Sequence, residues 1–146
     1  ITTFSQIPSA SGLGSSAAVT VATVASILAL KGKFSLEDVA KKSFEVEYEV
    51  QKGGSPNDTS ACSYGNAILV WEKEKEGYIW KITKDKTWYV YPVKAPDLRI
   101  VVGHTGIKSR TPLQIKKVRK FVEHSSFGKE LIKSFKKVVG WRVKST

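Results

Sequence analysis

The stretch Pro8-Ser-Ala-Ser-Gly-Leu-Gly-Ser-Ser-Ala-Ala18 decides how the rest of the chain is interpreted. Its glycines allow backbone N–H groups to approach an anion without an intervening Cβ. It opens an apolar segment of helical length that ends at Leu30, and a helix N-terminus adds unpaired amide donors and a partial positive charge. The hydroxyls of Ser15 and Ser16 can bond phosphate or ligate Mg²⁺. The stretch therefore predicts a phosphate-binding loop.

Two common nucleotide-binding motifs do not match this loop. No Gly-Lys-Ser/Thr follows at the spacing of a Walker A loop, and the full G-x-G-x-x-G pattern of dinucleotide-binding proteins is absent from the stretch. A lone Gly-x-Gly-Ser is equally typical of an ordinary helix entry. The longer run from Pro8 to Ala18 is far more specific than that fragment.

The rest of the chain predicts an α+β fold. Ser35 and Asp38 mark the N-cap and a capping box for a helix from Leu36 to about Val50. The segment 17–30 is apolar nearly all round, which predicts a buried helix. Further helices are expected at 57–64 and 111–124 and a basic amphipathic segment at 128–139; strands are expected at 67–71, 78–82, 88–91 and 98–102, with hairpin turns at 72–77 and 83–86.

Composition indicates a globular protein in a reducing compartment. The chain has 146 residues and a single cysteine, Cys62, which excludes an internal disulfide framework. The apolar stretch from Ala17 to Leu30 is too short and too polar for a membrane span, and no secretory signal pattern opens the chain. We therefore expect a cytoplasmic protein. The net charge of +11 fits nucleic-acid or membrane binding, but the lysines look scattered, which favours a solvated surface.

Two acidic residues stand out by position. Glu47 is aimed toward the apolar side of its helix, whereas Glu45 and Glu49 lie on the polar side. A carboxylate facing inward needs a partner or a metal, so Glu47 is either a site residue, a salt-bridge partner of a lysine, or exposed at the helix edge. Asp58 in Gly54-Ser-Pro-Asn-Asp-Thr59 is by pattern alone more typical of a cap or turn.

The loop and the two carboxylates together resemble the GHMP small-molecule kinases, most closely the archaeal type of mevalonate kinase. The run Pro8-x3-Gly-Leu-Gly-Ser-Ser-Ala-Ala18 looks like the family's second motif, and Glu47…Gly54-Ser-Pro-Asn-Asp58…Cys62-Ser-Tyr-Gly65 is similar to its later segment. The resemblance implies a GHMP kinase N-terminal domain, ribosomal protein S5 domain 2-like, over residues 1–124, with a basic tail at 125–146. The family's first motif and its C-terminal ferredoxin-like domain have no counterpart here, so the domain is expected to be incomplete.

The resemblance also implies roles for particular residues. Ser16 and Glu47 would hold Mg²⁺, and Asp58 would be the catalytic base or orient the substrate hydroxyl. His104 and Thr111 would lie beside the acceptor substrate, and either Arg110 or Lys108 could pair with a substrate carboxylate; His104 and Thr111 are, on pattern alone, more often structural. The residues that would bind ATP are Pro8, Ser9, Ala10, Ser11, Gly12, Leu13, Gly14, Ser15, Ser16 and Ala17.

The implied function is ATP-dependent phosphorylation of mevalonate to 5-phosphomevalonate, with this piece of chain inactive alone if the missing domain is needed. Alternatives are a sister kinase for phosphomevalonate, homoserine or shikimate, and a basic non-catalytic nucleic-acid-binding domain, which the lack of an RRM or KH motif disfavours. The expected partners are ATP and the small-molecule substrate, without a membrane. A homodimer is a further expectation, because unpaired sheet edges invite association.

Overall fold

The computed structural model describes residues 2–9, 11–103, 106 and 111–144, with the side chains of 111–112 and 139–144 excluded. The chain divides into two compact units, residues 1–107 and 108–146, which we describe separately.

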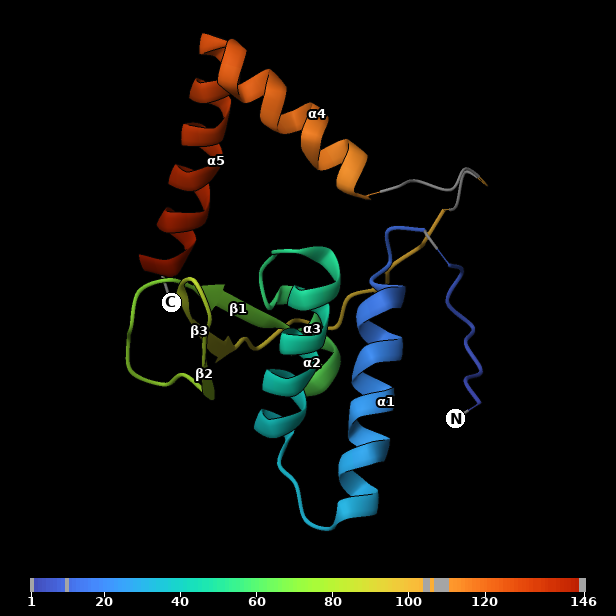
Figure 1. Ribbon diagram of the computed structural model, residues 1–146. Coiled ribbons are helices and arrows are strands. Elements are labelled where there is room, and N and C mark those ends of the chain that lie inside the picture. The colour runs from blue at the N-terminus through green and yellow to red at the C-terminus, as the bar shows by residue number, and fades with distance from the viewer. Residues whose placement is uncertain (1, 10, 104–105, 107–110, 145–146) are drawn as a thin grey trace. The chain divides into compact units, whose positions relative to one another are not determined.

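The first unit has helices α1, α2 and α3 followed by three strands. Helices α2 and α3 lie between α1 and the sheet (Figure 1). This arrangement confirms the predicted α+β class. The bounds are α1 Ser15–Lys31, α2 Leu36–Gln51, α3 Asn57–Tyr64, β1 Ile68–Trp71, β2 Trp80–Thr83 and β3 Thr87–Pro92.

The sheet is antiparallel, with strand order β1-β3-β2. Residues 84–86 form a hairpin turn as predicted, since Thr83 pairs with Thr87. The prediction that 72–77 is also a hairpin turn is wrong, because β1 pairs with β3 and this segment crosses to the far edge. The reason lies in long-range pairing: β3 is paired on both edges and carries the buried run Trp88, Tyr89 and Val90, whereas the polar residues at 72–77 indicate a change of chain direction and not which strands pair.

The fourth strand, predicted at 98–102, is also wrong. Residues 93–103 are irregular, and the large side chains in this run are exposed, with Val101 at 96%. The β-branched residues have the propensity for a strand, but propensity needs a neighbouring strand to pair with and a surface to pack on. Neither is provided by the described part of the first unit.

The core of the first unit joins α2 to the sheet. Ala40 and Phe44 of α2 pack with Trp80, Ile82, Trp88 and Val90. Phe44 makes an edge-to-face contact with Trp88, with ring centroids 5.5 Å apart. Because this contact fixes the sheet-facing side of α2, the residues on its other side are turned toward α1.

Helix α1 is less buried than its composition predicts. Only Ala17 and Val21 are buried among its described residues, and Leu30 is 88% exposed. The expectation of a helix buried on all sides is wrong, because α2 and α3 cover a single stripe of it. The small side chain of Ala17 allows that close approach near the helix start.

The start of α2 and the end of α3 agree with the sequence signals. Ser35 Oγ accepts a hydrogen bond from Asp38 N–H at 3.1 Å, and Asp38 Oδ2 accepts one from Ser35 N–H at 3.0 Å, so the predicted capping box is complete. Gly65 closes α3 in the left-handed conformation, with φ 76°. These local signals fix where the two acidic residues sit.

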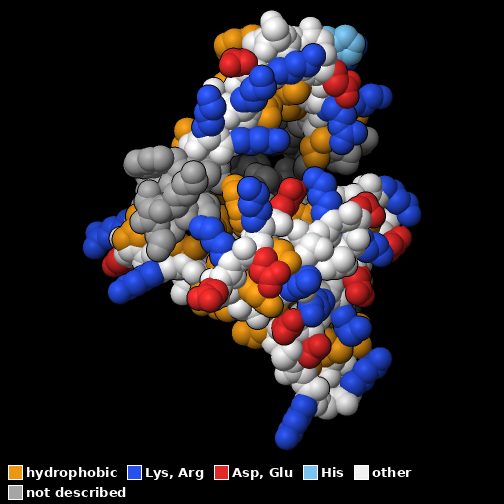
Figure 2. Space-filling view, turned by 90° about the vertical axis from the view of Figure 1, so that its left-hand side faces the viewer, with side chains coloured by type: hydrophobic (Ala, Val, Ile, Leu, Met, Phe, Trp, Pro, Cys, Tyr) orange, Lys and Arg blue, Asp and Glu red, His pale blue; other side chains and the backbone are white. Residues whose placement is uncertain are grey.

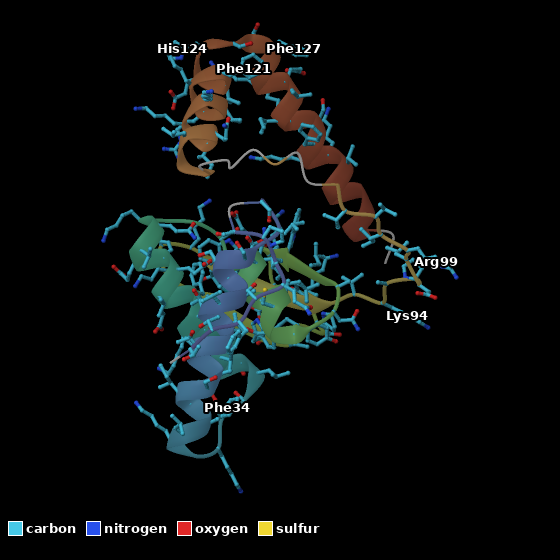
Figure 3. All side chains as sticks on the ribbon, turned by 90° about the vertical axis from the view of Figure 1, so that its right-hand side faces the viewer. Phe34, Lys94, Arg99, Phe121, His124 and Phe127 are labelled. Carbon is cyan, nitrogen blue, oxygen red and sulfur yellow. The ribbon has the colours of Figure 1, made fainter. Side chains whose placement is uncertain are left out.

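The second unit is a pair of helices, α4 (Thr111–His124) and α5 (Ser126–Lys144). The predicted helix 111–124 is confirmed, and the basic amphipathic segment is longer than predicted. Ser125 Oγ accepts from Gly128 N–H at 3.0 Å. Phe121, His124 and Phe127 lie at the corner between the helices (Figure 3), where a Cβ on Gly128 would come within 3.0 Å of the Phe121 ring. The glycine is therefore needed for close packing.

The positive charge is concentrated in this second unit. Residues 108–146 carry 12 of the 24 Lys and Arg residues and two of the 13 acidic ones, a formal charge of +10, whereas residues 1–107 carry +1. The expectation that the lysines are scattered is therefore wrong. The net charge of the whole chain therefore comes almost entirely from residues 108–146, and it says little about the surroundings of the glycine-serine loop.

Candidate active site

The glycine-serine loop is shaped by two left-handed residues. Gly12 has φ 77° and Gly14 has φ 70°, a region that side chains with a Cβ avoid. Ser11 Oγ donates to Pro8 O at 2.7 Å, which closes the turn before the helix. Ala10, predicted to contact ATP, lies outside the described residues.

The loop delivers free amides to the start of α1. The first helical hydrogen bond runs from Ala18 N–H to Gly14 O at 3.0 Å, so the preceding N–H groups of residues 15–17 have no intrahelical acceptor. No acidic residue lies in the first turn. The helix start thus presents donors and partial positive charge, which suits a phosphate.

The most informative contact of the site joins residues 31 positions apart. Ser16 Oγ donates a hydrogen bond to Glu47 Oε1 at 2.7 Å. Glu47 is half-buried while Glu45 and Glu49 are exposed, as their helical positions predict. Of the alternatives for Glu47, the lysine salt bridge is not what the described residues show, because Ser16 is its partner.

Glu47 is followed by two residues that tie α2 to the β2–β3 turn. The Tyr48 hydroxyl donates to the Asp85 carboxylate, and Glu49 pairs with Lys84 at 3.2 Å. Both acceptor and donor lie in or next to the 84–86 turn. The backbone around Glu47 is therefore attached to the sheet on one side while its own carboxylate reaches α1 on the other.

Asp58 lies in the first turn of α3 and is exposed. The capping position is Pro56, so Asp58 is not the N-cap that its sequence pattern suggests. Within the part of the chain that the structure describes, its carboxylate has no hydrogen bond or ion pair. Thr59, Ser60 and Ser63 are buried on the other side of α3, and this orients Asp58 toward solvent.

The buried side of α3 is held by the sheet. Trp80 Nε1 donates to Ser60 Oγ at 3.4 Å, and the Tyr64 and Trp80 rings meet edge to face at 6.2 Å. These contacts fix the rotation of a short helix whose own sequence is weakly amphipathic. Sequence reasoning missed Trp80 as a support of the site, since nothing in a strand pattern identifies its partner.

Cys62 lies close enough to both Asp58 and Glu47 for each carboxylate to affect its thiol. It lies one turn after Asp58 on α3 and is an exposed residue without a disulfide. Partial burial of its sulfur raises the pKa of the Cys62 thiol, and the negative charges of Asp58 and Glu47 raise it further. Both carboxylates thus act on the same sulfur, although they come from different helices.

This arrangement gives a prediction that needs no catalytic assay. Only the thiolate is nucleophilic, and the raised pKa moves thiolate formation to higher pH. We expect the neutral reagent iodoacetamide to alkylate Cys62 more slowly than an unhindered cysteine peptide at mildly alkaline pH. Asp58→Asn should lower the thiol pKa and shift the rate–pH profile to lower pH, without changing the plateau at high pH.

The matched control for this measurement is Glu45→Gln, on the exposed side of α2. It removes one negative charge, as Asp58→Asn does, and should leave the alkylation profile in place. An equal shift in both variants would contradict the proximity of Asp58 to the thiol, because it would reflect net charge alone.

Ser16 and Glu47 offer two oxygen ligands of the kind that Mg²⁺ accepts. Mg²⁺ is usually bound through one or two carboxylates together with substrate phosphates and waters. No group of three or more His, Cys, Asp or Glu side chains gathers among the described residues. The donor set fits a cation that is shared with a bound nucleotide, since the phosphates would supply the remaining ligands.

The predicted substrate residues lie outside the part of the chain whose side chains the structure describes. His104, Lys108 and Arg110 lie outside the described residues, as does the side chain of Thr111, although Thr111 does begin α4. The structure therefore brings together Ser16 and Glu47, sets Asp58 near the same cysteine, and leaves the acceptor side undescribed. The described helices contain no segment long and apolar enough to cross a bilayer.

The fold and this group of residues resemble those of a known class of protein domain. The family described as GHMP kinases N terminal domain matches residues 1–66, which include the loop, Glu47 and Asp58. This part of the chain is therefore similar to that family, as the sequence motifs predict.

Relatives that match a longer stretch share the name mevalonate kinase. The chain is 35% identical over 120 residues to the mevalonate kinase of Pyrococcus horikoshii, and 36% identical over 120 residues to that of Pyrococcus furiosus. Each alignment covers 82% of this chain and 31% of the relative. The mevalonate kinase of Methanothermobacter thermautotrophicus is 39% identical over 66 residues, 44% of this chain and 22% of that protein. The chain thus spans about a third of the length of the relatives that match it most extensively. No solved structure matches the chain.

Proposed function

We propose that this chain contributes the phosphate loop, the Mg²⁺ ligands and the acceptor-side carboxylate of a kinase site that transfers the γ-phosphoryl group of ATP to the hydroxyl of mevalonate. The observation that carries the proposal is the hydrogen bond from Ser16 to Glu47. It joins a helix start suited to phosphate with a carboxylate suited to Mg²⁺. The names of the relatives supply the substrate, and the GHMP family supplies ATP as phosphoryl donor.

The roles follow from the chemistry of phosphoryl transfer, in which the protein mainly positions groups and neutralises charge. The amides at the start of α1 would bind phosphate oxygens, and the left-handed glycines would let the backbone approach them. Mg²⁺, when bound, neutralises charge on the phosphates. The Ser16 hydroxyl and the Glu47 carboxylate would hold it.

Asp58 would act on the acceptor. An exposed carboxylate whose orientation is set by its helix can accept a hydrogen bond from the attacking hydroxyl, orient its lone pair and take its proton. The electrostatic effect of both Asp58 and Glu47 on Cys62 supports a site in which acceptor and metal lie close together.

The proposal is tested by binding and by transfer. The chain is titrated with ATP in the presence and absence of Mg²⁺ by calorimetry, and transfer to mevalonate is followed by phosphorus NMR. We expect Mg²⁺-dependent ATP binding, reduced in Gly14→Ala because of its positive φ, and retained in Leu30→Ala, at an exposed position near the far end of the same helix. Absence of ATP binding by the chain would refute the proposed phosphate loop.

The substrate is the finer part of the proposal. Phosphomevalonate, homoserine and shikimate are assayed beside mevalonate, since the acceptor side is the part of the site that the described residues do not define. Transfer to one of these and not to mevalonate would assign the chain to a sister kinase. The proposal includes a cytoplasmic location and a homodimer.

A further inference from the structure

The second unit carries a surface that the proposed kinase site does not use. On α5, Phe127, Leu131, Phe135 and Val138 recur at intervals of three and four residues and therefore lie on one face. They are exposed, with Phe127 at 68%, Phe135 at 60% and Val138 at 62%. A helix normally buries such a stripe, and an exposed apolar stripe of this length marks an interaction surface.

Helix α4 does not cover the stripe. A groove of about 650 Å³ lies between the two helices instead. It is lined by Ile115, Val118 and Val122 of α4 and by Ile132 of α5. Ile132 is three residues before Phe135 and borders the stripe, but the stripe side chains themselves stay exposed. The two helices thus bury one line of contact between them, and within the described residues of the second unit the stripe stays open.

The opposite side of α5 is cationic. Lys129, Lys133, Lys136 and Lys137 fall within one arc of the helix, and Glu130 is its single acidic residue. Figure 2 shows Lys and Arg side chains over the helix pair with hydrophobic side chains between them. Three of these lysines have no ion pair among the described residues; Lys133 pairs with Glu130 at 3.7 Å, and both side chains are exposed.

A cationic arc opposite an apolar Phe- and Leu-bearing stripe is the pattern of a helix that lies in a membrane interface. Anionic headgroups complement the charge of +10 on residues 108–146, and the interface accepts the phenylalanines. A nucleic acid would neutralise the lysines but leave the stripe in water. A neutral apolar partner would cover the stripe but leave the charge unused.

We propose that the α4–α5 unit binds peripherally to anionic lipid surfaces, with the Phe127–Val138 stripe of α5 in the interface and its lysines at the headgroups. This revises the sequence-based expectation that no membrane is a partner, and it is compatible with the absence of a spanning helix among the described residues. The inference does not depend on the proposed kinase activity.

Vesicle co-sedimentation of the whole chain tests the inference. Vesicles of phosphatidylglycerol and phosphatidylcholine in equal parts are compared with vesicles of phosphatidylcholine alone. We expect binding to the anionic vesicles, weakened by salt. The double variant Lys133→Gln/Lys137→Gln should lower the partition coefficient ~25-fold, since each lysine near such a surface contributes about 1 kcal/mol. The matched control Lys31→Gln/Lys33→Gln removes the same charge from the first unit and should bind like the parent chain.

A second pair of variants separates the stripe from the charge. Phe127→Ser/Phe135→Ser keeps every charge and should lower vesicle binding at least ~10-fold, whereas Phe4→Ser, at an exposed phenylalanine of the first unit, should not. All of these positions are exposed, and circular dichroism checks that the helices persist.

Three outcomes would overturn the proposal. One is salt-sensitive binding to a labelled oligonucleotide without binding to vesicles, which would identify a nucleic-acid surface. Another is a dimer by sedimentation that Phe135→Ser dissociates, without vesicle binding, which would assign the stripe to a second copy. The third is a loss of thermal stability in Phe127→Ser/Phe135→Ser without vesicle binding, which would show that the stripe packs within the chain.

Discussion

Asp58→Asn is expected to reduce the turnover number for mevalonate phosphorylation by about 10²–10⁴-fold, the usual contribution of a positioned general base. The amide can still accept a hydrogen bond from the substrate hydroxyl, but it cannot take the proton. Asp58 is exposed and is not the cap of α3, so the substitution should leave the fold intact. Initial rates at saturating ATP and mevalonate measure the loss.

Measuring ATP affinity and turnover number separately shows whether Asp58→Asn affects ATP binding or the transfer step. ATP affinity by calorimetry should stay close to that of the parent protein, because the carboxylate acts on the acceptor and not on the phosphate loop. Asp97→Asn, at an exposed aspartate after β3, is the matched control and should keep full activity. A normal turnover number for Asp58→Asn would remove Asp58 from the mechanism.

Glu47→Gln is expected to raise the Mg²⁺ concentration for half-maximal rate by at least ~10–100-fold. That is the effect typical of losing a supporting contact around a metal, and a direct ligand should matter no less. The variant keeps the size of the side chain and can still accept the Ser16 hydrogen bond. Thermal stabilisation by Mg²⁺ with a non-hydrolysable ATP analogue gives a second readout that does not need turnover.

The pairing of Ser16 with Glu47 can be measured by a double-mutant cycle. If both hold one cation, the effects of Ser16→Ala and Glu47→Gln on Mg²⁺-dependent stabilisation should fall short of additive in the double variant, as is usual for groups in one network. Glu45→Gln, two residues earlier on the exposed side of α2, should leave the Mg²⁺ response unchanged. Additive effects would place the two side chains at independent sites.

The sequence predicts those parts of the fold that local chemistry determines. The capping box at Ser35 and Asp38, the glycine that ends α3 and the helix from Thr111 are each specified by a few neighbouring residues, and each is found. Strand pairing depends on partners distant in sequence. The run 98–102 has strand composition but forms no strand, and the order β1-β3-β2 places β3 between two partners, which no local pattern reveals.

The candidate site shows the same division. Helical periodicity correctly separates Glu47 from Glu45 and Glu49, because all three lie on one regular helix. The partner of Glu47 is 31 positions away and could be inferred only from the family resemblance. The concentration of positive charge in residues 108–146 was present in the sequence but becomes meaningful once the chain is divided into its two units.

The attachment of Tyr48 and Glu49 to the β2–β3 turn has a consequence for ligand binding. Ordering one residue's backbone typically requires about 1–2 kcal/mol of conformational entropy. Around Glu47 that entropy is already lost in the folded protein, since both following side chains hold α2 to the sheet. A cation arriving with its nucleotide would need to restrict only the Ser16 and Glu47 side chains and the loop before α1. The hairpin turn at 84–86, which touches no ligand in this proposal, would then contribute to affinity by keeping Glu47 in place before the ligand arrives.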